Sequence, residues 1–221
     1  MKKIIYSLLI FMISSNIIFA QDKTEEKEKE DKTKKEKTFE EVTKQSKLIE
    51  GLFDIYQDSI SGKIQMLIKE EQLSKDFIYG SQIADGIVQA GGFRGLYNDE
   101  KIINFKKFFD KIEISFINTN FYFDKNNPLY KSREANISNA IISSSKIDFH
   151  DKENGTYLIN ANDLFLSESL TRVKPPSRPN QSRTAFSLGS LDKAKSKIMD
   201  IRNYPENLNI KADYVYNNQN I

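Results

Sequence analysis

The side chains best suited to acid–base or metal chemistry are scarce in this sequence. Among 221 residues there is one His, His150, and no Cys. Such a chain cannot build a thiol nucleophile, a Cys-based zinc or iron–sulfur site, or a metal centre that needs two imidazoles. His150 is expected at the edge of a hairpin, where a surface turn residue is the simplest role.

Carboxylates are the remaining candidates for chemistry. Two acid pairs, Glu70 with Glu71 and Asp148 with Asp151, could act as proton donor and acceptor. Their spacing does not distinguish them from solvated surface charge, so a carboxylate-only enzyme stays open as an alternative. We otherwise expect no catalytic, metal-binding or cofactor-binding residue, and no cofactor, in this chain.

A glycine-rich stretch is the nearest approach to a phosphate-binding motif. A phosphate loop needs closely spaced glycines that lead into a helix, ideally followed by Lys and Ser or Thr. Here Ala90-Gly91-Gly92-Phe93-Arg94-Gly95-Leu96 supplies an aromatic residue and Arg in place of Lys and Ser or Thr, which favours a loop between strands. The 33 Lys and Arg against 31 Asp and Glu give a formal charge of +2, so charge provides no argument for a nucleic-acid partner.

The amino terminus predicts export. Lys2 and Lys3 precede an apolar run from Ile4 to Ile13, and a small residue, Ala20, stands at a suitable cleavage point. This pattern is typical of a signal peptide over residues 1–20, and it is too short for a stable membrane span. We therefore expect a secreted, periplasmic or cell-surface protein with no stable membrane insertion after cleavage.

Residues 21–38 form a charged segment. Between Asp22 and Lys37 seven acidic and seven basic residues leave only Thr24 and Thr33 uncharged. Nothing in it can be buried to offset the entropy of ordering, so a disordered linker is predicted.

The body of the chain predicts an α+β fold that is predominantly β, with antiparallel sheets or a sandwich-like arrangement. Two short helices are expected at about 39–50, capped by Thr38, and at about 188–202, where apolar residues follow helical spacing. The segment 102–109 fits helix and strand templates about equally. A proline-containing basic segment from Arg172 to Arg183 is expected to be an exposed loop or a docking segment. The remaining apolar runs predict strands at 52–56, 63–68, 77–79, 112–123, 141–149, 156–159 and 208–216.

Two hairpins are the most specific local predictions. Lys63 to Ile68 alternates so that Ile64, Met66 and Ile68 share one face, and it should pair with the strand before it. Asn154-Gly155 between two alternating runs predicts a second hairpin. We expect a small domain at 39–90 and a second β-rich domain at 91–221, whose carboxyl-terminal end could be truncated.

Several phrases resemble the amino-terminal part of a family of secreted bacterial zinc-dependent metalloproteases, in which two domains of unknown function precede a zincin catalytic domain. The phrases are Ile49–Tyr56, Lys63–Ile68, Lys75–Phe77, Gly92–Gly95, Asn118–Phe121, Asn160–Phe165 and Ile201–Asn207, and they cover about residues 39 to 216. Their order carries the resemblance, because each phrase is made of ordinary residues.

The sequence departs from that family in one decisive respect. A zincin needs His-Glu-x-x-His on a helix, and a chain with one His cannot contain it. The resemblance therefore implies a non-catalytic accessory region, with zinc only in a separate catalytic domain and a protease domain or other protein as partner. The alternative is an independent periplasmic or surface binding module.

Overall fold

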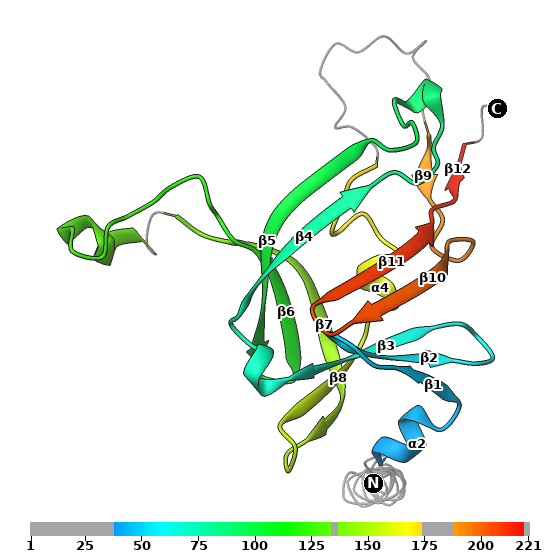
Figure 1. Cartoon of the computed structure of the whole chain (residues 1–221), viewed down its shortest axis with the longest axis horizontal. Helices are drawn as coiled ribbons and strands as arrows, with labels where there is room; N and C mark the ends of the chain where they lie inside the picture. The colour runs from blue at the N-terminus through cyan, green and yellow to red at the C-terminus, as the bar shows by residue number, and fades with distance from the viewer. Residues whose placement is uncertain (1–37, 134–136, 174–187, 219–221) are drawn as a thin grey trace, which may run out of the picture. The chain divides into compact units, whose positions relative to one another are not determined.

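The structure, a computed structural model, describes residues 38–133, 137–173 and 188–218. In this part of the chain eight strands form one antiparallel sheet, in the order β1-β2-β3-β8-β7-β6-β5-β4 (Figure 1). The strands are β1 (Ser46–Ile49), β2 (Asp54–Asp58), β3 (Ile64–Lys69), β4 (Asp76–Gln82), β5 (Tyr97–Phe108), β6 (Lys111–Phe116), β7 (Ala140–Asp151) and β8 (Thr156–Asn160). The predicted β-rich α+β class is confirmed.

Short elements complete the described fold. The α-helices are α2 (Phe39–Thr43) and α4 (Asn162–Phe165), and single 3₁₀ turns are η1 (Glu70–Gln72), η2 (Val88–Ala90) and η3 (Pro128–Ser132). Two further pairs are β10 (Lys197–Tyr204) with β11 (Asn207–Asp213), and β9 (Ser190–Leu191) with β12 (Tyr216–Asn217).

The core lies on the inner face of the central strands. Ile64, Met66 and Ile68 are buried, which confirms the face predicted from their alternation. They meet Ile112 and Ile114 of β6 together with residues of β8. Fully burying such side chains stabilises a fold by about 1.5–3 kcal/mol each relative to exposure.

Both predicted hairpins are present. β2 pairs antiparallel with β3, and β7 pairs with β8 across the turn that contains Asn154 and Gly155. Gly155 has φ +60°, a left-handed conformation that glycine adopts without a steric cost. The ambiguous segment 102–109 lies mostly in β5, a strand.

The predicted helix at 39–50 is too long. Thr38 caps α2 as expected, and its side chain and that of Glu41 form a reciprocal capping box. The helix ends at Thr43, however, and Ser46–Ile49 forms β1, which pairs with β2. Cross-strand pairing of Leu48 and Ile49 therefore overrides the local helical tendency.

The predicted helix at 188–202 is wrong. Within the described part of that range the chain forms β9 and most of β10. Ile198 and Ile201, three residues apart, both pack on the core because the β10–β11 register shifts between Ile198 and Asp200. A β-bulge thus produces a spacing that imitates a helix.

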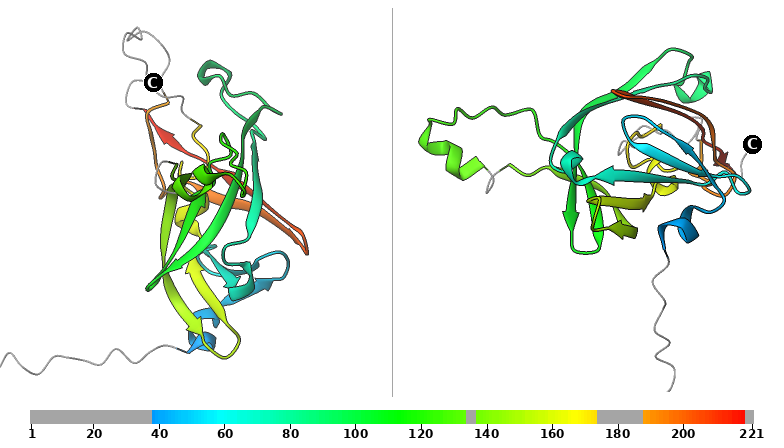
Figure 2. Two further views of the ribbon diagram at one scale, coloured as in Figure 1. Left: turned by 90° about the vertical axis from the view of Figure 1, so that its left-hand side faces the viewer. Right: turned by 60° about the horizontal axis from the view of Figure 1, so that its bottom comes forward.

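The β10–β11 hairpin is tied to the loop between β1 and β2. Asn203 Nδ2 donates to the carbonyl oxygens of Ile49 (2.8 Å) and Phe53 (2.7 Å), and Leu52 N donates to Tyr204 O (2.7 Å). A Cβ on Gly51 would lie 2.2 Å from Asn203 Oδ1, so only glycine permits this approach. Figure 2 shows the hairpin, in orange to red, as a ribbon separate from the sheet.

Strands from both sides of residue 90 share one sheet. β4 pairs with β5 across the connection that contains residue 90, and β3 pairs with β8. The described residues form one compact unit. The predictions for residues 1–20 and 21–37, and for 174–183 of the basic segment, lie outside the described residues.

Candidate functional site

The sequence candidates for acid–base chemistry do not assemble into one site. Glu70 and Glu71 are exposed in η1. Asp148 accepts a hydrogen bond from Gln65 Nε2 at 3.0 Å. His150 lies at the end of β7 rather than in a turn, and its ring stacks on Tyr157 at 4.5 Å between centroids.

Several aspartates instead stabilise turns. Asp151 Oδ1 accepts from the backbone N–H groups of Glu153 and Asn154, and Asp151 Oδ2 accepts from Asn154 Nδ2. These bonds lower the pKa of Asp151, and hydrogen bonds from Ser61 do the same for Asp58. Such ionised, fully engaged carboxylates hold turns in place and are poor general bases.

A tyrosine cluster joins β4 to two other segments. The Tyr79 hydroxyl is hydrogen-bonded to the Thr171 hydroxyl, and Tyr214 OH donates to the carbonyl oxygens of Phe165 and Ser167, each at 2.9 Å. Tyr216 OH donates to Glu168 Oε1 at 2.8 Å. Sequence reasoning missed this cluster, because its members lie far apart in the chain and no local pattern marks them.

Burial keeps these phenols neutral. Desolvation, with smaller contributions from Tyr79 and Glu168, raises the pKa of Tyr214 to about 12. Desolvation and the bond to Glu168 raise the pKa of Tyr216 well above its usual value. A neutral phenol that donates to fixed acceptors is a structural tie rather than a nucleophile, so the cluster positions β4 and does not indicate catalysis.

No metal site was identified in the part of the chain that the structure describes, where groups of three or more His, Asp and Glu that could hold an ion are absent. Across residues 38–133, 137–173 and 188–218, no helix has both the length and the apolar character needed to cross a bilayer.

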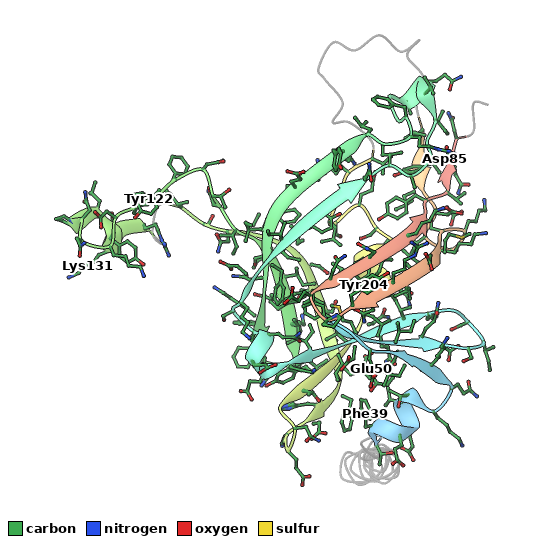
Figure 3. All side chains as sticks on the ribbon, viewed as in Figure 1. Phe39, Glu50, Asp85, Tyr122, Lys131 and Tyr204 are labelled. Atoms are coloured by element: carbon green, nitrogen blue, oxygen red, sulfur yellow. The ribbon has the colours of Figure 1, made fainter. Side chains whose placement is uncertain are left out.

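Six of the exposed large apolar side chains lie on two projections, and the others, among them Ile60, Ile78 and Phe109, are spread over the rest of the described chain. One projection is the β4–β5 connection (residues 83–96), where Ile87, Val88 and Phe93 are exposed. The other, here called the arm (residues 117–133), follows β6 and exposes Phe121, Tyr122 and Leu129. Figure 3 shows Asp85 in the first projection, and Tyr122 and Lys131 on the arm well away from the sheet.

Each projection has internal order. In the β4–β5 connection Gly92 N donates to Ile87 O, Gly95 N donates to Ile83 O, and Arg94 pairs with Asp85 at 3.0 Å. In the arm Asn127 caps η3 through Leu129 N, and Arg133 lies 5.1 Å from the centroid of the Tyr130 ring. The apolar side chains thus extend from a backbone that hydrogen bonds hold in place, which suits a binding surface.

The arm also encloses a hollow of about 350 Å³. Its lining combines aromatic rings, including Phe121, Tyr122 and Tyr130, with the charged side chains of Asp124, Lys125 and Arg133. Aromatic residues and Arg are enriched where proteins bind one another.

Fold and surface together define a β-rich protein. Residues 95–220 match the model of a family described as a domain of unknown function, DUF5117, and the chain belongs to that family. No curated protein and no solved structure gives a significant match to the chain.

Proposed function

We propose that this chain is an exported, non-catalytic accessory region of a zinc-metalloprotease-like protein. It binds a protein partner, such as a protease domain, through the arm and the β4–β5 connection. The observation that carries the proposal is that both projections expose aromatic and aliphatic side chains on a hydrogen-bonded backbone, with Tyr122 91% exposed. The ordered phrases shared with the metalloprotease family support the choice of partner.

The absence of catalysis is part of the proposal. With one His in the sequence, zinc chemistry requires a His-Glu-x-x-His motif supplied by a separate domain. The signal-peptide pattern in residues 1–20 supports export. No cofactor is assigned to this chain.

Binding to a zincin domain tests the proposal. The mature chain, carrying a fluorophore, is titrated with the His-Glu-x-x-His domain of a full-length relative, and anisotropy is measured. We expect saturable binding that the pair Phe121→Ser and Tyr122→Ser weakens at least about tenfold, since aromatic anchors carry much of the energy of an interface.

Ile60→Ser is the matched control, because Ile60 is 79% exposed in the β2–β3 turn, away from both projections. It should leave the affinity unchanged. No binding by the unaltered chain, or equal weakening by Ile60→Ser, would contradict the proposal.

An independent binding module is the second candidate, and the pairing of β11 favours it. This strand near the end of the sequence pairs with β10, and both contribute side chains to the core. A monomer with one cooperative thermal transition would support a module that folds alone, whereas a molten or aggregating product would count against it.

A further inference from the structure

β4 ends the eight-stranded sheet with an unpaired edge. Its seven residues pair with β5 on one side, and in the described residues no strand pairs with the other side. Alternate N–H and C=O groups of an edge strand point outward and can bond another chain. β4 is therefore a template for one more strand.

The residues of β4 lack the features that usually keep an edge strand from pairing. Natural edge strands are blunted by Lys, by Pro, by bulges or by shortness. Asp76–Gln82 contains neither Lys nor Pro, and the only register shift in its pairing with β5 comes at the end, between Ser81 and Gln82. Ile78 projects from the strand with 87% of its surface exposed.

The inner face of β4 is incompletely covered. Phe77, Tyr79 and Ser81 point inward but are only half-buried, whereas Ile112 and Ile114 of β6 are fully buried. Ser81 Oγ is shielded from solvent and lies beside the Tyr79 hydroxyl. An added strand would cover these side chains.

The charged side chains beside the outer edge of β4 indicate which kind of partner segment would fit there. On the outer face, Asp76 of β4 and Glu100 of β5 are exposed, and Ile78, Gly80 and Gln82 share that face. No cation lies among the outward residues from 76 to 82. A segment with apolar residues directed inward and a Lys or Arg directed outward would therefore complement this edge.

We propose that the outer edge of β4 binds an extended segment of a partner polypeptide as an additional antiparallel strand. Backbone hydrogen bonds supply most of the affinity, inward apolar side chains cover Phe77 and Tyr79, and an outward cation faces Asp76. The inference rests on the proposed binding function and specifies how the partner is held.

A strand-forming peptide fused to the chain tests this proposal. A peptide of alternating valine and threonine with an outward lysine is fused to the carboxyl end of the mature chain through a flexible Gly-Ser linker, which gives millimolar effective concentration. Amide hydrogen exchange of β4 is compared with that of a fusion in which proline interrupts the strand. We expect the valine–threonine fusion to slow exchange in β4 about tenfold or more, and the proline fusion to leave it unchanged.

Ile78→Lys is the blocking variant, because it adds a like charge opposite the lysine of the peptide at an exposed position. It should reduce the protection by at least about threefold, while Ile60→Lys, also at an exposed position, should not. Equal exchange in the valine–threonine and proline fusions would overturn the proposal. So would a dimer of the unfused chain in light scattering with β4 already protected, since a second copy would then occupy the edge.

The experiment separates this inference from the proposed function. A zincin domain that binds while β4 exchange stays unchanged would overturn strand addition alone. Protection by the valine–threonine strand without any binding of the zincin domain would contradict the accessory role alone.

Discussion

The two edges of the main sheet differ in how they are closed. β1 has four residues, including Lys47, and the loop after it is held by Asn203 and Tyr204 of the β10 end. β4 has seven residues without Lys or Pro and no strand partner on its outer side in the described chain. The end of β1 and the loop after it are held by tertiary contacts, whereas the outer side of β4 is left able to pair. The difference predicts that loss of contacts near β1 costs more stability than a change on the outer side of β4.

Loss of the Asn203 side-chain hydrogen bonds should have the largest effect on the free energy of unfolding. Asn203→Ala leaves the partly buried carbonyls of Ile49 and Phe53 without this donor, and an unsatisfied group costs about 1–3 kcal/mol when it is fully buried. We expect the free energy of unfolding to fall by about 3 kcal/mol in urea titrations. Asn209→Ala, at an exposed position in β11, should change it little. Equal losses of stability in Asn203→Ala and Asn209→Ala would mean that the Asn203 hydrogen bonds do not stabilise the β1–β2 loop.

Removal of the aromatic contact between α2 and strands β2 and β7 should come next. The Phe39 ring lies 5.4 Å from the rings of both Tyr56 and Phe149. Phe39→Ala should lower the free energy of unfolding by about 2 kcal/mol through lost burial and ring contacts. Hydrogen exchange should quicken in β2 and β7 but not in β4. Tyr122→Ala, at an exposed position, is the control, and faster exchange in β4 would contradict the separation of the two edges.

Alkaline pH should weaken the attachment of Tyr214 to the segment that contains Phe165 and Ser167. Because the folded pKa of Tyr214, about 12, lies above its unfolded value of 10.0, its contribution is complete below pH 10 and is lost as pH rises through 12. Unfolding curves recorded between these pH values should show falling stability. Tyr214→Phe should flatten that decline, whereas Tyr204→Phe should not. An unchanged slope in Tyr214→Phe would argue against a tie through this phenol.

Low pH should destabilise the turns that the side chains of Asp58, Asp151 and Asp192 stabilise. The pKa values of Asp58, Asp151 and Asp192 are lowered by hydrogen bonds, so their stabilisation is present above about pH 3.8 and is lost as pH falls through their folded values. Asp151→Asn should reduce the steepness of acid unfolding followed by circular dichroism. A curve identical to that of the unaltered chain would contradict this role. The β1 side should respond more than the β4 side, because Asp58 pairs with Ser46 of β1 and none of the three turns belongs to β4.

The smallest effect on stability should come from the exposed edge itself. Ile78→Lys replaces a side chain that is 87% exposed, so the free energy of unfolding should change by no more than about 0.5 kcal/mol. Chemical denaturation measures this directly. A loss above about 2 kcal/mol would mean that Ile78 supports the fold and that β4 is not reserved for binding.

Local pattern predicted the elements whose neighbours in sequence are also neighbours in space. The β2–β3 pair, the Asn154-Gly155 turn and the Thr38 cap all depend on residues close together, and all three are present. The helix predicted at 188–202 failed because a bulge between Ile198 and Asp200 gave β10 a helical spacing. The tyrosine cluster could not be predicted, since its contacts span almost the whole described chain.

The sequence by itself determined the β-rich class, the alternating core faces and, through a single His and no Cys, the shortage of metal and thiol chemistry. These properties depend on composition and on periods of a few residues. Only the tertiary structure decided that the β10–β11 hairpin holds the loop between β1 and β2 and that, in the described residues, β4 has no strand partner on its outer side. The physical reason is that strand pairing joins residues far apart in the chain, so the position of an edge is a property of the whole sheet.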